Sequence, residues 1–310
     1  MQALLDLLPS LQPGADAERL FHGRGGRFPG SEDWTLDWFP PCWVLTSFAP
    51  AEAAQLAAFA AALGRRWAQL APGAPLCWIH HCRQVGQEGR AAPQLMAGSL
   101  PEPHAVGEDG ARFLVHLLRG QNHGLFLDMR EGRRWLRTQV QGGSGAKVLN
   151  LFAYSCAFSV VALQAGAGEV VNVDMSAGAL AIGRRNHALN GVDDGRARFL
   201  AHDVFNSWGK LTRGGPYDFV ILDPPMFQKG SFVAEKDYPR LLRRLPGLLA
   251  PGGRALLALN SPKLGSVFLH ESMAREAPGM QFVERLANPP AFADVDEERS
   301  LKVLIYTRPA

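Results

Sequence analysis

The chain has 310 residues, of which 47% are hydrophobic and 20% charged, and its formal net charge is +3. This composition is typical of a globular protein with a sizeable core, and it excludes a disordered chain, a collagen and a disulfide-stapled miniprotein. No apolar run reaches the roughly 18 residues that a membrane-spanning helix needs. Four cysteines without regular spacing fit a reducing compartment, and Asp6 interrupts the apolar N-terminus, unlike in a secretory signal. We therefore expect a cytoplasmic protein.

The first hundred residues favour short strands separated by turns. Residues 34–39 and 42–48 are expected strands, divided by Pro40-Pro41, whose rings cannot continue a ladder of hydrogen bonds. The Ala and Leu content of residues 51–63 predicts a helix. Residues 75–80 and 112–118 are further predicted strands, whereas the polar, Gly-containing residues 84–103 favour a loop. We assign residues 1–120 to a small N-terminal α+β domain.

From about residue 124, short β-branched runs alternate with segments of helical length. The predicted strands are residues 147–152, 169–174, 197–201, 218–223, 254–260, 280–286 and 301–307. The predicted helices are residues 157–165, 177–190, 238–249 and 264–276. This alternation predicts an α/β domain over residues 121–310, with a mostly parallel, Rossmann-like sheet of seven strands and helices on both faces. The last two strands have no helix between them, so we expect them to be antiparallel.

Ligands of such a sheet bind beyond the carboxyl ends of its strands, so the residues that follow each strand are site candidates. Asp174 ends the second strand, where a carboxylate can accept both hydroxyl hydrogens of a ribose. Met175 can lie on an adenine face, and Asp203 can accept from the adenine amino group. The alternative is that such acids cap the next helix. Three strand ends with an aspartate, at Asp174, Asp203 and Asp223, weigh against that alternative.

A nicotinamide dinucleotide is not favoured by the turn after the first strand. That turn lacks the glycines of the G-x-G-x-x-G fingerprint, which allow a pyrophosphate to approach the backbone. The glycines of residues 142–145 come before the strand, where they cannot serve this purpose. A phosphate-binding G-x-x-x-x-G-K-[ST] loop is also missing from the sequence.

Five spaced motifs, in this order, resemble those of bacterial ribosomal RNA large-subunit methyltransferases. They are residues 124–134 (GLFLDMREGRR), 150–154 (NLFAY), 173–176 (VDMS), 185–191 (RNHALNG) and 223–227 (DPPMF). The chain resembles the guanine-N7 methyltransferase half of the K/L enzyme, and more distantly the type I cytosine-C5 enzymes. This resemblance, which covers about residues 30–310, implies a class I methyltransferase that uses S-adenosylmethionine.

The resemblance also implies roles for individual residues. Asp128 and Arg130 would lie near the methionine end of the cofactor, where Arg130 suits its carboxylate. Asp174 would hold the ribose, Met175 would cover the adenine and Asp203 would meet its amino group. The other implied cofactor-binding residues are Asn150, Phe152, Tyr154, Ser155, Ser176 and Val204.

One residue departs from the family pattern. Cys156 stands where the family usually has a glycine, after Tyr154 and Ser155. Glycine lets the backbone approach a ligand closely and adopt positive φ. We therefore expect that Cys156 either narrows the cofactor pocket or is tolerated as a small residue in the turn.

The chemistry of methyl transfer narrows the target base. Cytosine C5 needs a cysteine to attack C6, and the loops at residues 223–227 and 260–262 contain none. Guanine N7 has its own lone pair and needs only in-line placement against the methyl group. An exocyclic amine stays open, with Asp223 or the Pro224 carbonyl accepting its hydrogen. The predicted catalytic residues are Asp223, Pro224, Pro225 and Phe227.

Contacts with the substrate are predicted at three residues. Phe227 can stack on an unpaired base, although a core position is the alternative. Lys229 can contact a phosphate, and Arg83 lies in a turn that resembles a family feature. The basic run of Arg240, Arg243 and Arg244 fits phosphate contacts or a solvated helix face. The cysteines and histidines of residues 77–82 have the wrong spacing for a zinc site, so no metal is predicted.

The sequence thus predicts methyl transfer from S-adenosylmethionine to RNA, at a guanine of ribosomal RNA, without a covalent cysteine intermediate. The near balance of 32 basic and 29 acidic residues does not by itself indicate an RNA substrate. Two alternatives are therefore kept open. One is a methyltransferase that acts on a protein or a small molecule, and the other is an inactive protein that binds the cofactor or RNA.

Overall fold

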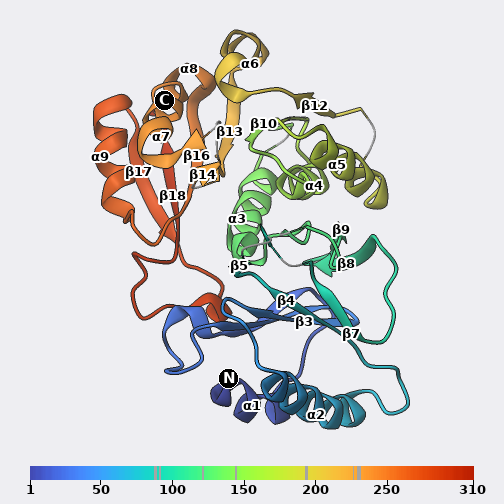
Figure 1. Cartoon of the computed structure of the whole chain (residues 1–310). Coiled ribbons are helices and arrows are strands. Elements are labelled where there is room, and N and C mark those ends of the chain that lie inside the picture. The colour runs from blue at the N-terminus through green and yellow to red at the C-terminus, as the bar shows by residue number, and fades with distance from the viewer. Residues whose placement is uncertain are drawn as a thin grey trace. The chain divides into compact units, whose positions relative to one another are not determined.

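The computed structural model describes residues 1–86, 89–90, 92–120, 122–143, 145–192, 195–225, 227–228 and 232–310. The chain divides into two units, one of residues 1–127 with 290–295 and one of residues 128–289 with 296–310. Each unit contains its own main sheet (Figure 1). The domain boundary predicted at residue 120 stays a prediction. In the part of the chain that the structure describes, no helix is long and apolar enough to cross a membrane.

The first unit is built on a five-stranded sheet with the order β1-β2-β3-β4-β7. Its strands are β1 (Glu18–His22), β2 (Trp34–Phe39), β3 (Cys42–Ser47), β4 (Cys77–Cys82) and β7 (Gln94–Ala97), and its helices are α1 (Gln2–Leu7) and α2 (Ala53–Leu70). Strands β3 and β4 are parallel, and α2 connects them. Two short pairs follow, β5 (Val85–Gly86) with β6 (Gly89–Arg90) and β8 (His104–Glu108) with β9 (Ala111–Val115).

Alternation along β2, β3 and β4 sends four tryptophans into one core with Phe59 and Leu63 of α2. The predicted strands at residues 34–39 and 42–48 are confirmed to within a residue, whereas α2 extends seven residues beyond its predicted end at residue 63. The predicted loop at residues 84–103 contains β7, which pairs with β4. Most of β7 is exposed, and it lacks the apolar pattern that would have revealed a strand.

The second unit contains the predicted seven-stranded sheet, with the order β12-β11-β10-β13-β16-β18-β17. Its strands are β10 (Lys147–Leu151), β11 (Glu169–Asp174), β12 (Ala197–Ala201), β13 (Tyr217–Leu222), β16 (Leu249–Asn260), β17 (Gln281–Leu286) and β18 (Leu301–Thr307). The first five are mutually parallel, and β18 pairs antiparallel with both β16 and β17. A short pair, β14 (Phe227–Gln228) with β15 (Phe232–Val233), follows β13.

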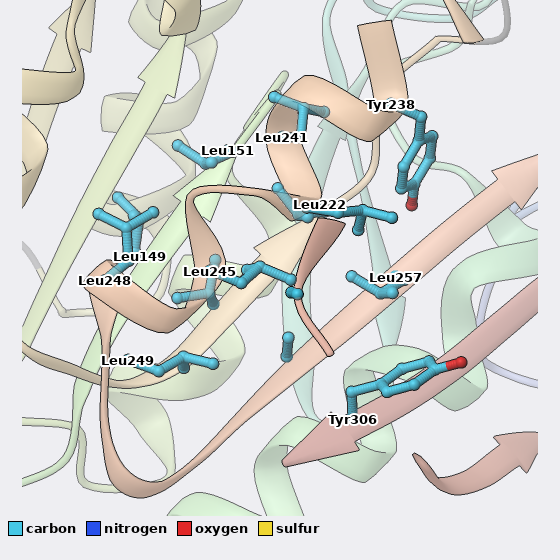
Figure 2. Close-up of a cluster of buried hydrophobic side chains, with 14 of the residues drawn as sticks. Leu149, Leu151, Leu222, Tyr238, Leu241, Leu245, Leu248, Leu249, Leu257 and Tyr306 are labelled. Carbon is cyan, nitrogen blue, oxygen red and sulfur yellow. The ribbon is translucent and has the colours of Figure 1, made fainter. Parts of the chain in front are cut away.

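Helices cover both faces of this sheet. They are α3 (Arg130–Gln141), α4 (Ala157–Gln164), α5 (Ala177–Leu189), α6 (Trp208–Gly214), α7 (Ala234–Leu242), α8 (Leu245–Leu248) and α9 (Ser266–Glu276). On one face, Leu149 and Leu151 of β10 share a core with α7 and α8 (Figure 2). On the other face, Val148 packs with α3 and α4. Because β10 is apolar on both sides, it is a central strand, as its near-continuous hydrophobic run indicates.

Two helices differ from the sequence-based expectation. The predicted helix at residues 238–249 starts at Ala234 and is divided into α7 and α8. Pro246 explains the division, since it has no N–H to donate to the carbonyl of Leu242 and its ring would clash there. Helix α3 was not predicted, because its apolar stripe is limited to a few residues, such as Trp135, Leu136 and Val140, within a strongly charged segment.

Candidate functional site

The strand order reverses between β10 and β13, and this switch point places the candidate site. The chain moves outward from β10 to β12 and then returns to β13 on the other side of β10. Loops that leave neighbouring strands on opposite faces diverge there, and they leave a crevice at the carboxyl edge. The loops after β10, β11, β12, β13 and β16 all lie at this edge because these strands are parallel.

The turn after β10 has an unusual backbone. Phe152, Tyr154 and Cys156 have φ values of 59°, 47° and 61°, in the left-handed region that glycine normally occupies. For other residues this conformation costs about 1–2 kcal/mol each. The turn is held by hydrogen bonds from Ala153 N to the Val173 carbonyl (3.0 Å) and from Asn186 Nδ2 to the Ser155 carbonyl (2.9 Å). Strained turns of this kind cluster at functional sites.

Asp174 joins this turn to the next loop. Its Oδ2 accepts a hydrogen bond from Tyr154 N (2.9 Å), and its Oδ1 accepts from Ser176 N (2.8 Å). The N-cap of α5 is Ser176, whose Oγ accepts from Ala179 N (3.1 Å), so Asp174 is not the helix cap. A carboxylate has about four acceptor positions, which leaves capacity for two hydroxyl groups. The neighbouring Met175 is 55% exposed, as a side chain that covers a ligand should be.

Cys156 points away from this edge. Its side chain is fully buried beside Ala153 and Leu180, and its sulfur lies where a Cβ on Gly183 would come within 2.4 Å. Gly183 of α5 therefore makes room for the thiol that replaces the usual glycine. Burial raises the pKa of the Cys156 thiol, which keeps it protonated. The turn tolerates a cysteine because the extra atoms are placed against a helix.

A chain of buried hydrogen bonds connects the strands before and after the turn to helices α4 and α5. Asn150 Nδ2 donates to Asn172 Oδ1 (2.9 Å), and Asn172 Nδ2 donates to Ser159 Oγ (3.0 Å). Ser159 Oγ and His187 Nε2 are 2.9 Å apart, and His187 Nδ1 lies 2.7 Å from the Gly183 carbonyl. Because a carbonyl only accepts, His187 donates from Nδ1 and accepts at Nε2. The chain links both strands to α4 and to the residue that faces Cys156.

This network includes one predicted residue and adds others. The amide of Asn150 is buried and donates to the neighbouring strand, and its predicted contact with the cofactor stays a prediction. Sequence reasoning missed Asn172, Ser159 and His187 as supporting residues. The available signal was an asparagine in the middle of each of two apolar strands.

The carboxylate of Asp203 accepts hydrogen bonds from residues that follow it closely in the sequence. Its Oδ1 accepts from Phe205 N (2.9 Å) and its Oδ2 from Asn206 Nδ2 (2.6 Å), so it caps the short helix Val204–Asn206. This is the capping role that the sequence left open. Its contact with an adenine amino group stays a prediction. The side chain of Val204 is buried in the core, so only its backbone can face a ligand.

Asp223, directly after β13, differs from the other strand-end aspartates. Burial, followed by the negative charge of Asp128, raises the pKa of Asp223 to about 7, although Arg133 opposes this shift. Within the described residues, we find no hydrogen bond to its carboxylate. Asn260, at the end of β16, donates from Nδ2 to Asp128 Oδ2 over 3.4 Å. The ends of β13 and β16 and the start of α3 thus bring two carboxyl groups and an amide into one neighbourhood.

A lysine that the sequence analysis missed holds the loop after β16 in place through hydrogen bonds. Lys302 of β18 is fully buried, and its Nζ donates to the carbonyls of Ser261 and Glu298. Burial lowers the pKa of Lys302 to about 8. Ser261 Oγ accepts in turn from Lys263 N (3.2 Å) and Leu264 N (3.0 Å). The signal was a single lysine within the apolar run of residues 301–307.

The remaining predicted site residues are placed as follows. Asp128 and Arg130 lie at the start of α3 and are half-buried, whereas Pro224 is buried and Pro225 half-buried. The backbone of Phe227 belongs to β14, but its side chain lies outside what the structure describes, as does all of Lys229. Arg83 belongs to the first unit, where its backbone N–H donates to the Ser47 carbonyl. In the parts of the chain described, no group of three His, Cys, Asp or Glu side chains can hold a metal ion.

Comparison with known proteins identifies this arrangement. Residues 18–307 match the S-adenosylmethionine-dependent methyltransferase family. The chain belongs to this family. The family's cofactor is S-adenosylmethionine, and the predicted resemblance and fold class are confirmed.

Two relatives of the chain are named ribosomal RNA large subunit methyltransferases. The chain is 32% identical to "Ribosomal RNA large subunit methyltransferase I" of Erwinia tasmaniensis over 97% of this chain and 76% of that protein. It is 38% identical to "Ribosomal RNA large subunit methyltransferase K/L" of Psychrobacter sp. over 56% of this chain and 22% of that protein. The chain spans 47% of the length of two other type I relatives that it matches.

A solved methyltransferase structure complexed with SAH shares the fold. It superposes with a TM-score of 0.79 at 24% identity, covering 94% of this chain and 75% of that chain. The residues of this chain fit the cofactor on structural grounds of their own. Asp174 keeps acceptor capacity at the carboxyl edge, Met175 is exposed beside it, and the thiol of Cys156 points toward α5.

Proposed function

We propose that this chain transfers a methyl group from S-adenosylmethionine to a guanine of ribosomal RNA by direct in-line displacement. The names of its relatives support ribosomal RNA as the substrate class. The observation that carries the direct mechanism is the composition of the loops after β13 and β16, which offer Asp223 and Asn260 but no cysteine. The reaction belongs to the cytoplasm, where bacterial ribosomal RNA is made.

When bound, the cofactor supplies a methyl group on a positively charged sulfur. Asp174 orients the ribose, and the turn at residues 152–156 supports the methionine part, with Arg130 and Asp128 near its end. Asp223 in its ionised form accepts a hydrogen bond from an N–H of the target base. This hydrogen bond aligns the base with the methyl group. Pro224 and Pro225 restrict the backbone around this carboxylate, since their rings fix φ.

The modified atom is N7 or the exocyclic amine. Guanine N7 attacks with its own lone pair, so the chain only has to position it. An exocyclic amine loses a proton after the methyl group has been transferred, and the ionised Asp223 carboxylate takes up that proton, while the Pro224 carbonyl can accept a hydrogen bond from the amine. Phe227 stacks on the base, Lys229 contacts a phosphate and Arg83 contacts the substrate in this proposal.

The test is transfer of labelled methyl from S-adenosylmethionine into total RNA from a strain that lacks this gene, followed by nucleoside analysis. Label in a single methylguanosine supports the proposal and names the atom. Label in 5-methylcytidine overturns the direct mechanism. A parallel calorimetric titration with the cofactor distinguishes the remaining outcomes.

Cofactor binding without label in RNA would direct the search to proteins and small molecules. Neither binding nor label would mean that the chain has lost the activity of its family. The variant Asp174→Ala serves as the negative control for transfer, because it removes the proposed ribose acceptor.

A further inference from the structure

Two arginines, Arg240 in α7 and Arg244 just before α8, lie over aromatic rings that follow β12. The guanidinium carbon of Arg240 lies 4.1 Å from the ring centre of Phe205, and that of Arg244 lies 5.6 Å from the ring centre of Trp208. The two rings meet edge to face with their centres 6.2 Å apart. These four residues, which we call the Arg–aromatic surface, all belong to the second unit.

The helices next to this surface in the sequence have a positive net charge. Helices α6, α7 and α8, with the two residues between α7 and α8, carry six Lys and Arg against two acids, a net +4. The whole chain has a net charge of only +3. Five of the six basic side chains are exposed and have no described carboxylate partner or only one within the same helix. They are Lys210, Arg213, Lys236, Arg240 and Arg244.

The two acids offset part of the positive charge of these helices. Asp237 is buried, where it accepts from Val233 N (2.8 Å) and pairs with Arg240 (2.7 Å). That pair uses one amino group of Arg240 and leaves its other donors available. Glu235 is the only exposed acid of these three helices.

The Arg–aromatic surface is continuous with the candidate site. Phe205 comes two residues after Asp203, at the carboxyl edge of the sheet. Its ring stacks on that of Phe232, with centres 6.3 Å apart. Phe232 belongs to β15, which pairs with the backbone of Phe227 directly after the Asp223 loop. A polymer with one unit in the candidate site therefore reaches this surface with its neighbouring units.

Arg243 provides an internal contrast. It lies between the two arginines in sequence and is 63% exposed, but it pairs with Glu276 of α9 at 2.6 Å. Arg240 is also ion-paired, with Asp237 of its own helix, but Arg240 lies over an aromatic ring as well. The run of three arginines, whose role the sequence left open, thus contains two residues that lie over aromatic rings and one, Arg243, whose described contact is an ion pair with another helix.

We propose that the Arg–aromatic surface binds single-stranded RNA that flanks the target nucleotide. A guanidinium that lies over an aromatic ring has fewer positions open to it, and its remaining donors can bind phosphate while its plane can stack on a base. Exposed lysines nearby add affinity that does not depend on sequence. The inference rests on the proposed function, because it assumes that the substrate is RNA.

The test compares the double variant Arg240→Gln/Arg244→Gln with the single variant Arg243→Gln and the parent. Binding of a fluorescein-labelled single-stranded ribosomal RNA fragment is measured by anisotropy at several salt concentrations. We expect the double variant to bind about tenfold more weakly. Its plot of log K against log salt should be shallower by about 1.4, since each lost phosphate contact reduces the slope by about 0.7.

The control Arg243→Gln removes one positive charge from the same segment and should bind within about twofold of the parent. Cofactor affinity and melting temperature are measured for all variants, and Arg244→Lys should retain the salt slope but lose the stacking contribution. Unchanged RNA binding by the double variant overturns the proposed RNA-binding role of this surface and leaves the proposed function intact. An equal loss in Arg243→Gln also overturns it, because the effect is then one of net charge. A parent protein that binds no RNA overturns both proposals.

Discussion

Asp174 and Asp223 are both aspartates at the carboxyl ends of strands in one sheet, since Asp174 ends β11 and Asp223 follows β13. Their surroundings differ. Asp174 accepts two backbone hydrogen bonds, from Tyr154 N and Ser176 N, which fix both of its oxygens. Asp223 has no hydrogen bond among the described residues, and burial next to Asp128 raises its pKa to about 7. One aspartate is thus a fixed acceptor, and the other can change its protonation state near neutral pH.

The difference teaches that position at the carboxyl edge selects candidates but does not assign roles. Backbone donors stabilise the charged form of a carboxylate, whereas burial beside a second carboxylate disfavours it. Asp174, whose two oxygens are held in place by backbone N–H groups, suits a sugar whose hydroxyl groups need acceptors in fixed positions. Asp223 suits a step in which a hydrogen is accepted and later released. Three predictions test this contrast, and a fourth tests the turn that Asp174 holds.

The largest effect is expected for Asp174→Ala. Two hydrogen bonds to a charged acceptor contribute about 1.5–3 kcal/mol each, so the cofactor Kd should rise about 100-fold or more. Isothermal calorimetry measures this change. Asp218→Ala is the matched control, because Asp218 also accepts a backbone hydrogen bond, from Lys147 N, but at the amino end of β13. Unchanged affinity in Asp174→Ala would remove this residue from the cofactor site.

Asp223→Asn should separate binding from transfer. The amide keeps the shape of the side chain but cannot take a proton, so turnover should fall about 100-fold or more. The cofactor Kd should stay within about twofold, since the ribose acceptor is untouched. Single-turnover transfer to RNA and calorimetry on the same preparation give both numbers. If the Asn variant retains full turnover, Asp223 has no part in the reaction.

The pH dependence follows from the raised pKa of Asp223. Transfer that needs the ionised carboxylate should be constant above pH 7 and decrease about tenfold per unit below it. Stability should show the opposite sign. A folded-state pKa above the unfolded value of 3.8 means that Asp223 lowers the free energy of unfolding progressively between about pH 4 and 7. Asp223→Asn should therefore melt higher than the parent at pH 8 and at the same temperature at pH 4.

The smallest effect on the cofactor is expected at Cys156. Because its side chain faces Gly183 rather than the carboxyl edge, Cys156→Gly should bind the cofactor at least as tightly as the parent. Gly183→Ala should instead destabilise the fold by about 1–3 kcal/mol, since its new Cβ would overlap the thiol. The double variant should recover part of that loss, as thermal melts can show. Weakened cofactor binding in Cys156→Gly would give the cysteine a role of its own.

Much of the second unit was predictable because its signals are local. Apolar runs that alternate with helix-length segments predicted β10 and β13 to within one residue at each end. They predicted β11, β12 and β18 with the observed bounds. The site loops follow directly, since the residue after a strand is known once the strand is known. Prediction failed where the pattern is weak, as for the exposed β7, or where a charged segment hides a narrow apolar stripe, as for α3.

By itself, the sequence determined the order of the strands, the α/β class, the family and the aspartates at the carboxyl edge. Only the tertiary structure decided what surrounds each of these groups. The direction of the Cys156 thiol depends on Gly183, and the pKa of Asp223 depends on Asp128, which is 95 positions earlier in the sequence. The division among the three arginines depends on Phe205, Trp208 and Glu276. The physical reason is that burial, charge and packing act through space between distant segments, whereas patterns in the sequence report mainly on neighbours along the chain.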